Sequence, residues 1–170
     1  MNAEPLLNRI AAVFAEHRLE AIMVGNAAAA LHGAPVTTLD IDFMFRKTPL
    51  NMKKLKAVAH TLRATILKPY YPVSDLFRVV NDEQGLQLDF MTRLHGIRSF
   101  EGLSSRANSM DFGQHQLLVT ARADNENAVA ALAEKTERSI IDQIRRLLAL
   151  PMNKRTKFLR VRHPSGGSHL

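Results

Sequence analysis

The chain has 170 residues, of which 46% are hydrophobic and 23% are charged, and it contains no cysteine. This composition is typical of one soluble globular domain, and the lack of cysteine excludes disulfides, thiolate catalysis and cysteine-ligated zinc. No stretch approaches the roughly 20 apolar residues of a membrane span, and the N-terminal residues have no signal-peptide pattern. We therefore expect a cytoplasmic protein with no membrane partner.

The net charge of +7 is concentrated near the C-terminal end. Residues 151–170 hold five basic and no acidic side chains, which leaves a net charge of +2 for residues 1–150. We expect a single domain over residues 1–150 and a basic, flexible tail over residues 151–170. Such a tail is either a solvated segment or a segment that attracts RNA phosphates.

Apolar spacing and turn residues predict an order of elements along the first half of the chain. The alanine-rich helix is expected to have Asn26 as its N-cap and Gly33 at its C-terminal end. The predicted elements are a helix over 5–17, a buried strand over 20–25, the alanine-rich helix over 26–33, a strand over 39–46 and a helix over 50–66.

The second half of the chain begins with a predicted hairpin, in which "DEQG" (82–85) joins two strands. The elements expected here are strands over 76–81 and 86–92, a short helix near 99–106, strands over 109–112 and 116–121, a helix over 125–134 and an amphipathic stripe over 140–148. Helices and strands do not alternate regularly, so we predict an α+β domain with a mixed β-sheet flanked by helices.

Two aspartates stand one residue apart in the predicted strand "LDIDFMFR". Successive side chains of a strand point to opposite faces, so Asp40 and Asp42 share one face, opposite the apolar residues at 39, 41, 43 and 45. If the strand "LQLDFM" (86–91) is a neighbour, Asp89 joins them. Three close carboxylates repel one another unless cations lie between them, and oxygen-only ligands suit Mg²⁺ or Mn²⁺. These three aspartates are the candidate metal ligands and catalytic residues.

The stretch "MVGNAAAALHGAPVTTLDIDFMF" (23–45) resembles the signature of small stand-alone nucleotidyltransferases of the DNA polymerase beta-like superfamily, among them those of toxin–antitoxin and abortive-infection systems. That signature is a hydrophobic strand, a Gly-Gly/Ser/Asn turn, a small-residue helix, His-Gly, and Arg-x-Thr-x-Asp-hydrophobic-Asp. The resemblance implies a polymerase beta-like nucleotidyltransferase fold. It also implies that Gly25 and Asn26 bind the NTP phosphates at a helix start, and that Asp40, Asp42 and Asp89 bind metal.

The chain departs from this signature at Val36, where the family usually has arginine. Arg46, with Lys47 beside it, is a candidate to replace that arginine at the triphosphate, and the alternative is an ordinary charge at a strand end. Lys135 is a further candidate nucleotide contact, and the alternative is a surface charge of a helix.

The resemblance implies a Mg²⁺-dependent enzyme that transfers a nucleoside monophosphate from an NTP to a hydroxyl and releases pyrophosphate. The acceptor is RNA such as a tRNA end, a protein side chain or a small molecule, and the basic tail favours RNA. The alternative is a catalytically degenerate member used as a binding or antitoxin module, which Val36 favours. Either function is compatible with a toxin–antitoxin partner protein. A haloacid-dehalogenase-like phosphatase is disfavoured because "DIDFMFR" continues as a strand.

Overall fold

The computed structural model describes residues 4–67 and 75–127. The chain divides into the units Met1–Ala131 and Leu132–Leu170, and every described residue belongs to the first unit. The predicted domain boundary at residue 150, the basic tail, the stripe over 140–148 and Lys135 therefore lie outside the described residues and stay predictions.

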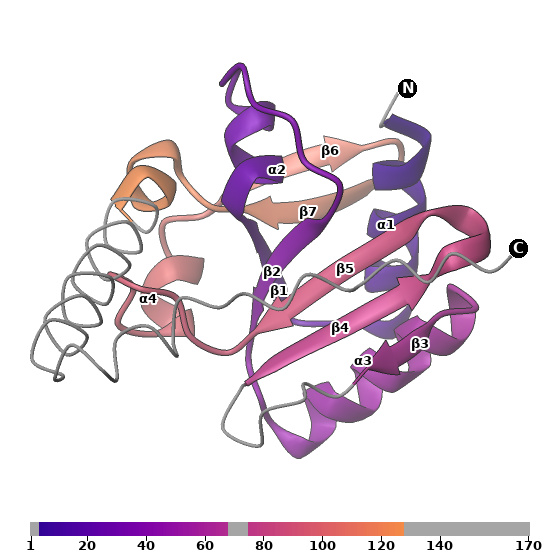
Figure 1. Ribbon diagram of the computed structural model, residues 1–170. Coiled ribbons are helices and arrows are strands. Elements are labelled where there is room, and N and C mark those ends of the chain that lie inside the picture. Colours follow the sequence, from indigo (N-terminus) through magenta and orange to yellow (C-terminus); the bar gives the residue numbers. More distant parts are fainter. Residues whose placement is uncertain (1–3, 68–74, 128–170) are drawn as a thin grey trace, which may run out of the picture. The chain divides into compact units, whose positions relative to one another are not determined.

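The described residues form a seven-stranded mixed sheet with helices on its two faces (Figure 1). The strand order is β3-β4-β5-β2-β1-β7-β6, in which β1–β7 and β2–β5 are parallel pairs and the other pairs are antiparallel. The elements are α1 (Glu4–His17), β1 (Ala21–Val24), α2 (Gly25–Leu31), β2 (Ile41–Phe45), α3 (Pro49–Thr61), β3 (Thr65–Leu67), β4 (Leu76–Asn81), the 3₁₀ turn η1 (Asp82–Gln84), β5 (Leu86–Met91), α4 (Phe100–Ser104), β6 (Asn108–Phe112) and β7 (His115–Val119). This architecture confirms the predicted α+β class.

The larger core lies between α1, α3 and one face of the sheet. Phe14 of α1 packs on Phe43 of β2 with ring centroids 4.9 Å apart, and Phe43 stacks on Phe90 of β5 at 5.3 Å. A smaller cluster covers the other face, where Leu103 of α4 packs against Met44 and the β1 residues Ile22 and Val24. None of the helices in the described part of the chain is long and apolar enough to span a membrane.

The predicted helix over 50–66 is too long, because α3 ends at Thr61 and residues 65–67 form strand β3. Thr48 caps the start of α3 by accepting from the Asn51 N–H, and Pro49 follows at the first helical position. At the other end Arg63 has a φ of +52°, which turns the chain out of the helix into β3, the neighbour of β4. Ile66 continues the apolar spacing of the helix, which is why periodicity extended the prediction too far.

Two buried asparagines hold the residues at either end of β1. Asn51 accepts from the Glu20 N–H and donates to the Glu20 carbonyl, both at 3.0 Å. Asn125 accepts from the Gly25 N–H at 2.9 Å and donates to the Gly25 carbonyl at 3.0 Å. Each amide therefore satisfies both backbone groups of one residue where the ladder of β1 stops.

Candidate metal centre

Three aspartates come together at the end of β2 nearest α2. Asp42 of β2 is paired with Val24 of β1 on one side and with Asp89 of β5 on the other. One carboxylate oxygen from each of Asp40, Asp42 and Asp89 lies within 4.8 Å of the others. The structure thus brings together the three aspartates singled out in the sequence, which are called the carboxylate cluster below.

Asp40 lies just before β2 rather than within it. The strand begins at Ile41, and Leu39 is 98% exposed, so the prediction that Leu39 shares the buried face is wrong. Asp40 is oriented by side chains instead: the Thr38 hydroxyl donates to its Oδ1 at 2.7 Å, and Gln87 Nε2 donates to its Oδ2 at 3.4 Å. Side-chain hydrogen bonds, one local and one from β5, therefore position the first aspartate rather than the strand ladder.

Asp89 is buried and is bound by an arginine that sequence reasoning missed. Arg78 of β4 lies opposite Asp89 in the hairpin register. Its Nε donates to Asp89 Oδ1 at 2.8 Å and its Nη2 donates to Asp89 Oδ2 at 2.6 Å. The sequence held the signal, because a four-residue turn that joins position 81 to position 86 also sets 78 opposite 89.

The repulsion within the carboxylate cluster affects the pKa of Asp42. Burial, together with the charges of Asp40 and Asp89, raises its pKa to about 6, and the charge of Arg78 opposes this rise. A divalent cation would relieve this repulsion, and the donor set is made of carboxylate oxygens alone. The residues present therefore fit Mg²⁺ or Mn²⁺.

Gly25 lies directly against Asp42. Its φ is +69°, and a Cβ atom at this position would lie 2.5 Å from Asp42 Oδ2. Both facts require glycine here. Helix α2 begins at Gly25 with Val24 as its N-cap, so Asn26 lies within the first turn and the prediction of Asn26 as the N-cap is wrong.

The Gly25 N–H is already hydrogen-bonded to Asn125 Oδ1. The structure therefore corrects the expectation that this amide is a phosphate donor, and it leaves the amides from Asn26 onward as the candidates. Asn125 lies 100 residues from Gly25, and no local sequence pattern links the two.

The chain matches no protein-family model and no curated protein. Among solved structures, it matches a protein from Thermotoga maritima with a provisional assignment as a nucleotidyltransferase, at 13% identity over 82% of this chain and 89% of that chain, with a TM-score of 0.66. The chain has the nucleotidyltransferase fold. The antibiotic-resistance factor ANT(2'')-Ia also matches, at 15% identity over 69% of this chain and 64% of that chain, but its TM-score of 0.48 is too low to support an argument.

The nucleotidyltransferase fold confirms the architecture that the motif in residues 23–45 implied. Membership of the toxin–antitoxin group stays a prediction. At these identities the likeness shows the fold alone.

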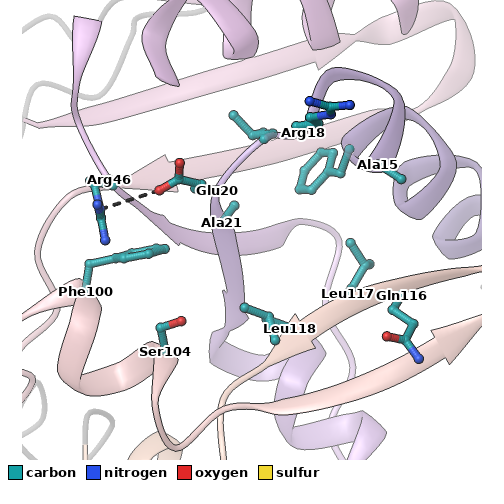
Figure 2. A pocket seen from close by; sticks show the side chains of 12 residues that line it. Ala15, Arg18, Glu20, Ala21, Arg46, Phe100, Ser104, Gln116, Leu117 and Leu118 are labelled. Carbon is teal, nitrogen blue, oxygen red and sulfur yellow. Dashed lines mark ion pairs between the residues drawn. The ribbon is translucent and has the colours of Figure 1, made fainter. Parts of the chain in front are cut away.

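Within this fold, Arg46 does not lie at the carboxylate cluster. It follows β2 four residues after Asp42, roughly 13 Å away at about 3.3 Å per residue. Its guanidinium is paired with Glu20 at 3.5 Å and Glu101 at 3.0 Å, and it lies 5.4 Å from the centroid of the Phe100 ring. Figure 2 shows Arg46, Glu20 and Phe100 among the side chains that line a cavity of about 460 Å³. The structure therefore does not bring Arg46 to the carboxylate cluster, and its contact with the triphosphate stays a prediction.

We predict that Asn125→Ala weakens both folding and metal binding. The change leaves the Gly25 N–H and carbonyl without their partners, which should lower the free energy of unfolding by about 2–4 kcal/mol. Because Gly25 contacts Asp42, the affinity for Mn²⁺ should fall as well. The measurements are urea unfolding followed by circular dichroism, and Mn²⁺ titration.

Asn51→Ala is the matched control, because Asn51 holds the residue at the opposite end of β1. It should lower stability by a similar amount and leave the Mn²⁺ affinity unchanged. Equal losses of Mn²⁺ affinity in the two variants would contradict a specific link between Asn125 and the carboxylate cluster.

Proposed function

We propose that this protein is a Mg²⁺-dependent nucleotidyltransferase, which transfers a nucleoside monophosphate from an NTP to an acceptor hydroxyl and releases pyrophosphate. The observation that carries the proposal is the carboxylate cluster, whose ligand oxygens lie within 4.8 Å of one another on a nucleotidyltransferase fold. The glycine at the edge of the cluster supports it, since only glycine leaves room for Asp42.

In this proposal Asp40 and Asp42 hold two metal ions and Asp89 completes the site of one of them. The ions supply Lewis-acid chemistry, which activates the acceptor hydroxyl and neutralises charge on the leaving pyrophosphate. Thr38 and Gln87 fix the orientation of the Asp40 carboxylate, and Gly25 gives Asp42 its space. Thr38, Gln87 and Gly25 therefore position the carboxylates that would bind the metal ions.

The nucleotide phosphates are assigned to the first turn of α2, from the Asn26 amide onward. Unpaired N–H groups at a helix start favour anions, and this start adjoins Asp42 through Gly25. Lys135 is a further proposed nucleotide contact, outside the described residues.

A labelling experiment identifies the class of molecule that accepts the nucleotide. The protein is incubated with each α-labelled NTP, Mg²⁺ and total cellular RNA or protein. We expect label on RNA, because residues 151–170 hold five basic and no acidic side chains, a charge balance that attracts phosphates. Label on protein alone would redirect the acceptor assignment, and no transfer with any NTP and any acceptor fraction would contradict the proposed function.

A catalytically degenerate binding or antitoxin module is the second candidate. It rests on Val36, an exposed apolar residue where the family signature has arginine. Titration calorimetry of NTP with and without Mg²⁺ separates the two candidates, because a module without catalytic function needs no metal-dependent NTP affinity. A pure scaffold also has no need of three carboxylates that repel one another. A toxin–antitoxin partner protein stays a prediction from the sequence resemblance.

Metal binding should depend on pH through Asp42, whose pKa is raised to about 6. Between the ordinary value of 3.8 and about 6, the folded protein holds a proton that the unfolded chain releases. Lowering the pH through this window therefore stabilises the metal-free protein at this group, whereas a metal ligand must be deprotonated. We expect the apparent Mn²⁺ affinity to fall about tenfold per pH unit below pH 6. Mn²⁺ titration followed by electron paramagnetic resonance tests this, and a flat affinity from about pH 7.5 to about pH 5 would contradict it.

A further inference from the structure

A positively charged side chain of the protein, Arg78, lies at the carboxylate cluster. The Arg78 guanidinium binds both oxygens of Asp89, at 2.8 and 2.6 Å. Arg78 and Asp89 come from adjacent strands and face each other directly in the register. Three aspartates and one arginine therefore form a single charged group, in which only Asp89 has a guanidinium partner among the described residues.

The two members of this pair differ in their freedom to move. The Asp89 side chain is 5% exposed, whereas the Arg78 side chain is 42% exposed. A displaced guanidinium can therefore turn toward water, but Asp89 cannot leave its place without losing buried contacts. Breaking such a pair leaves a buried carboxylate without its counter-ion, which is unfavourable unless another cation replaces it.

A divalent cation at the cluster would meet Arg78 as a competitor. Both Asp89 oxygens already accept hydrogen bonds, so a metal must share or take one of them. The guanidinium and the cation also repel each other across the carboxylate that both contact. The part of the Arg78–Asp89 interaction that is lost when a metal binds is thus subtracted from the free energy of metal binding.

We propose that Arg78 is a positioning residue that competes with the metal for Asp89. This inference rests on the metal site of the proposed function. In the metal-free protein, Arg78 holds Asp89 in the orientation that the cluster needs and balances one of its charges. In the metal-bound protein it has lost part of this interaction, so the affinity for free metal is lower than three carboxylates alone would give.

The test is Mn²⁺ titration and metal-free thermal unfolding of Arg78→Gln. Loss of a positive charge roughly 5–6 Å from a divalent ion should tighten Mn²⁺ binding about tenfold in water-like screening. The same change should lower the metal-free melting temperature, because Asp89 loses its ionic partner. Arg78→Lys keeps the charge but loses the two-pronged geometry, so its Mn²⁺ affinity should stay within about threefold of the wild type.

Arg106→Gln is the matched control, since Arg106 binds Asp124 through the same pair of nitrogens, both at 2.9 Å. It should lower the melting temperature without tightening Mn²⁺ binding. If the wild type binds Mn²⁺ and Arg78→Gln leaves that affinity unchanged or weakens it, the role proposed for Arg78 is overturned. The metal site of the proposed function is not affected by that result. Absence of Mn²⁺ binding in the wild type and in every variant would overturn the metal site of the proposed function and this inference with it.

Discussion

Replacing Asp42 by asparagine is expected to lower the rate of nucleotidyl transfer by about a thousandfold or more, because the change removes a proposed ligand of both metal ions. The metal-free protein should at the same time keep or gain stability near neutral pH. The Asp42 pKa is raised to about 6, so above this pH the folded state carries a charge that burial and the neighbouring aspartates disfavour. Asparagine removes that charge and keeps the shape.

The Asp42→Asn experiment combines pyrophosphate release with thermal unfolding. The gain in stability should shrink as the pH falls through about 6 toward 3.8, since the wild-type carboxyl is then protonated. Asp111→Asn is the control, because Asp111 is an exposed residue of β6 and should leave both quantities unchanged. If Asp42→Asn lost transfer because it unfolded, or if it kept full transfer, the assigned role of Asp42 would be contradicted.

The second large effect is expected at Gly25. An alanine there must adopt a φ of +69°, which costs about 1–2 kcal/mol. Its Cβ would also lie 2.5 Å from Asp42 Oδ2 and 3.2 Å from Asp42 Cγ, so the carboxylate has to move. We expect Gly25→Ala to lower the free energy of unfolding by about 2–4 kcal/mol and to lower transfer by about a hundredfold.

Gly85→Ala separates the two causes. Gly85 has a φ of +59° in the hairpin turn, and no atom lies within 4 Å of its added Cβ. Urea unfolding should therefore reveal the backbone cost alone, about 1–2 kcal/mol, with no change in transfer or Mn²⁺ affinity. If Gly25→Ala and Gly85→Ala had the same effect on Mn²⁺ affinity, close packing of Gly25 on Asp42 would not matter to the site.

The sequence predicted those parts of the site that depend on local periodicity. Strand alternation placed Asp42 and Asp89 each on the face opposite its apolar sequence neighbours, because the side-chain period of two holds within any regular strand. The pairing of β2 with β5, which the sequence left as a condition, sets the two aspartates side by side. Alternation failed for Leu39, which precedes the strand and is exposed. Asp40 does lie beside Asp42 as predicted, but hydrogen bonds from Thr38 and Gln87 orient it rather than the strand. The alternation of side-chain direction holds only for residues that belong to the hydrogen-bonded strand.

Residues that meet across long chain separations were not predictable in the same way. Gly25 and Asn125 are joined by two hydrogen bonds although they are 100 residues apart in sequence, and no sequence pattern near either residue predicts the pair. Arg46 is the opposite case, since it is close to Asp42 in sequence but the extended strand places it at the far end of β2. Proximity in sequence is a poor guide along a strand, where each residue adds about 3.3 Å.

The central claim is that Asp40, Asp42 and Asp89 bind divalent metal together with an NTP. Its most direct test is a crystal structure with Mn²⁺ and a non-hydrolysable NTP analogue, in which anomalous scattering locates the metal. The account predicts Mn²⁺ bonded to carboxylate oxygens of all three aspartates and to the triphosphate. Mn²⁺ and nucleotide bound at another place, with the three carboxylates bare, would contradict it.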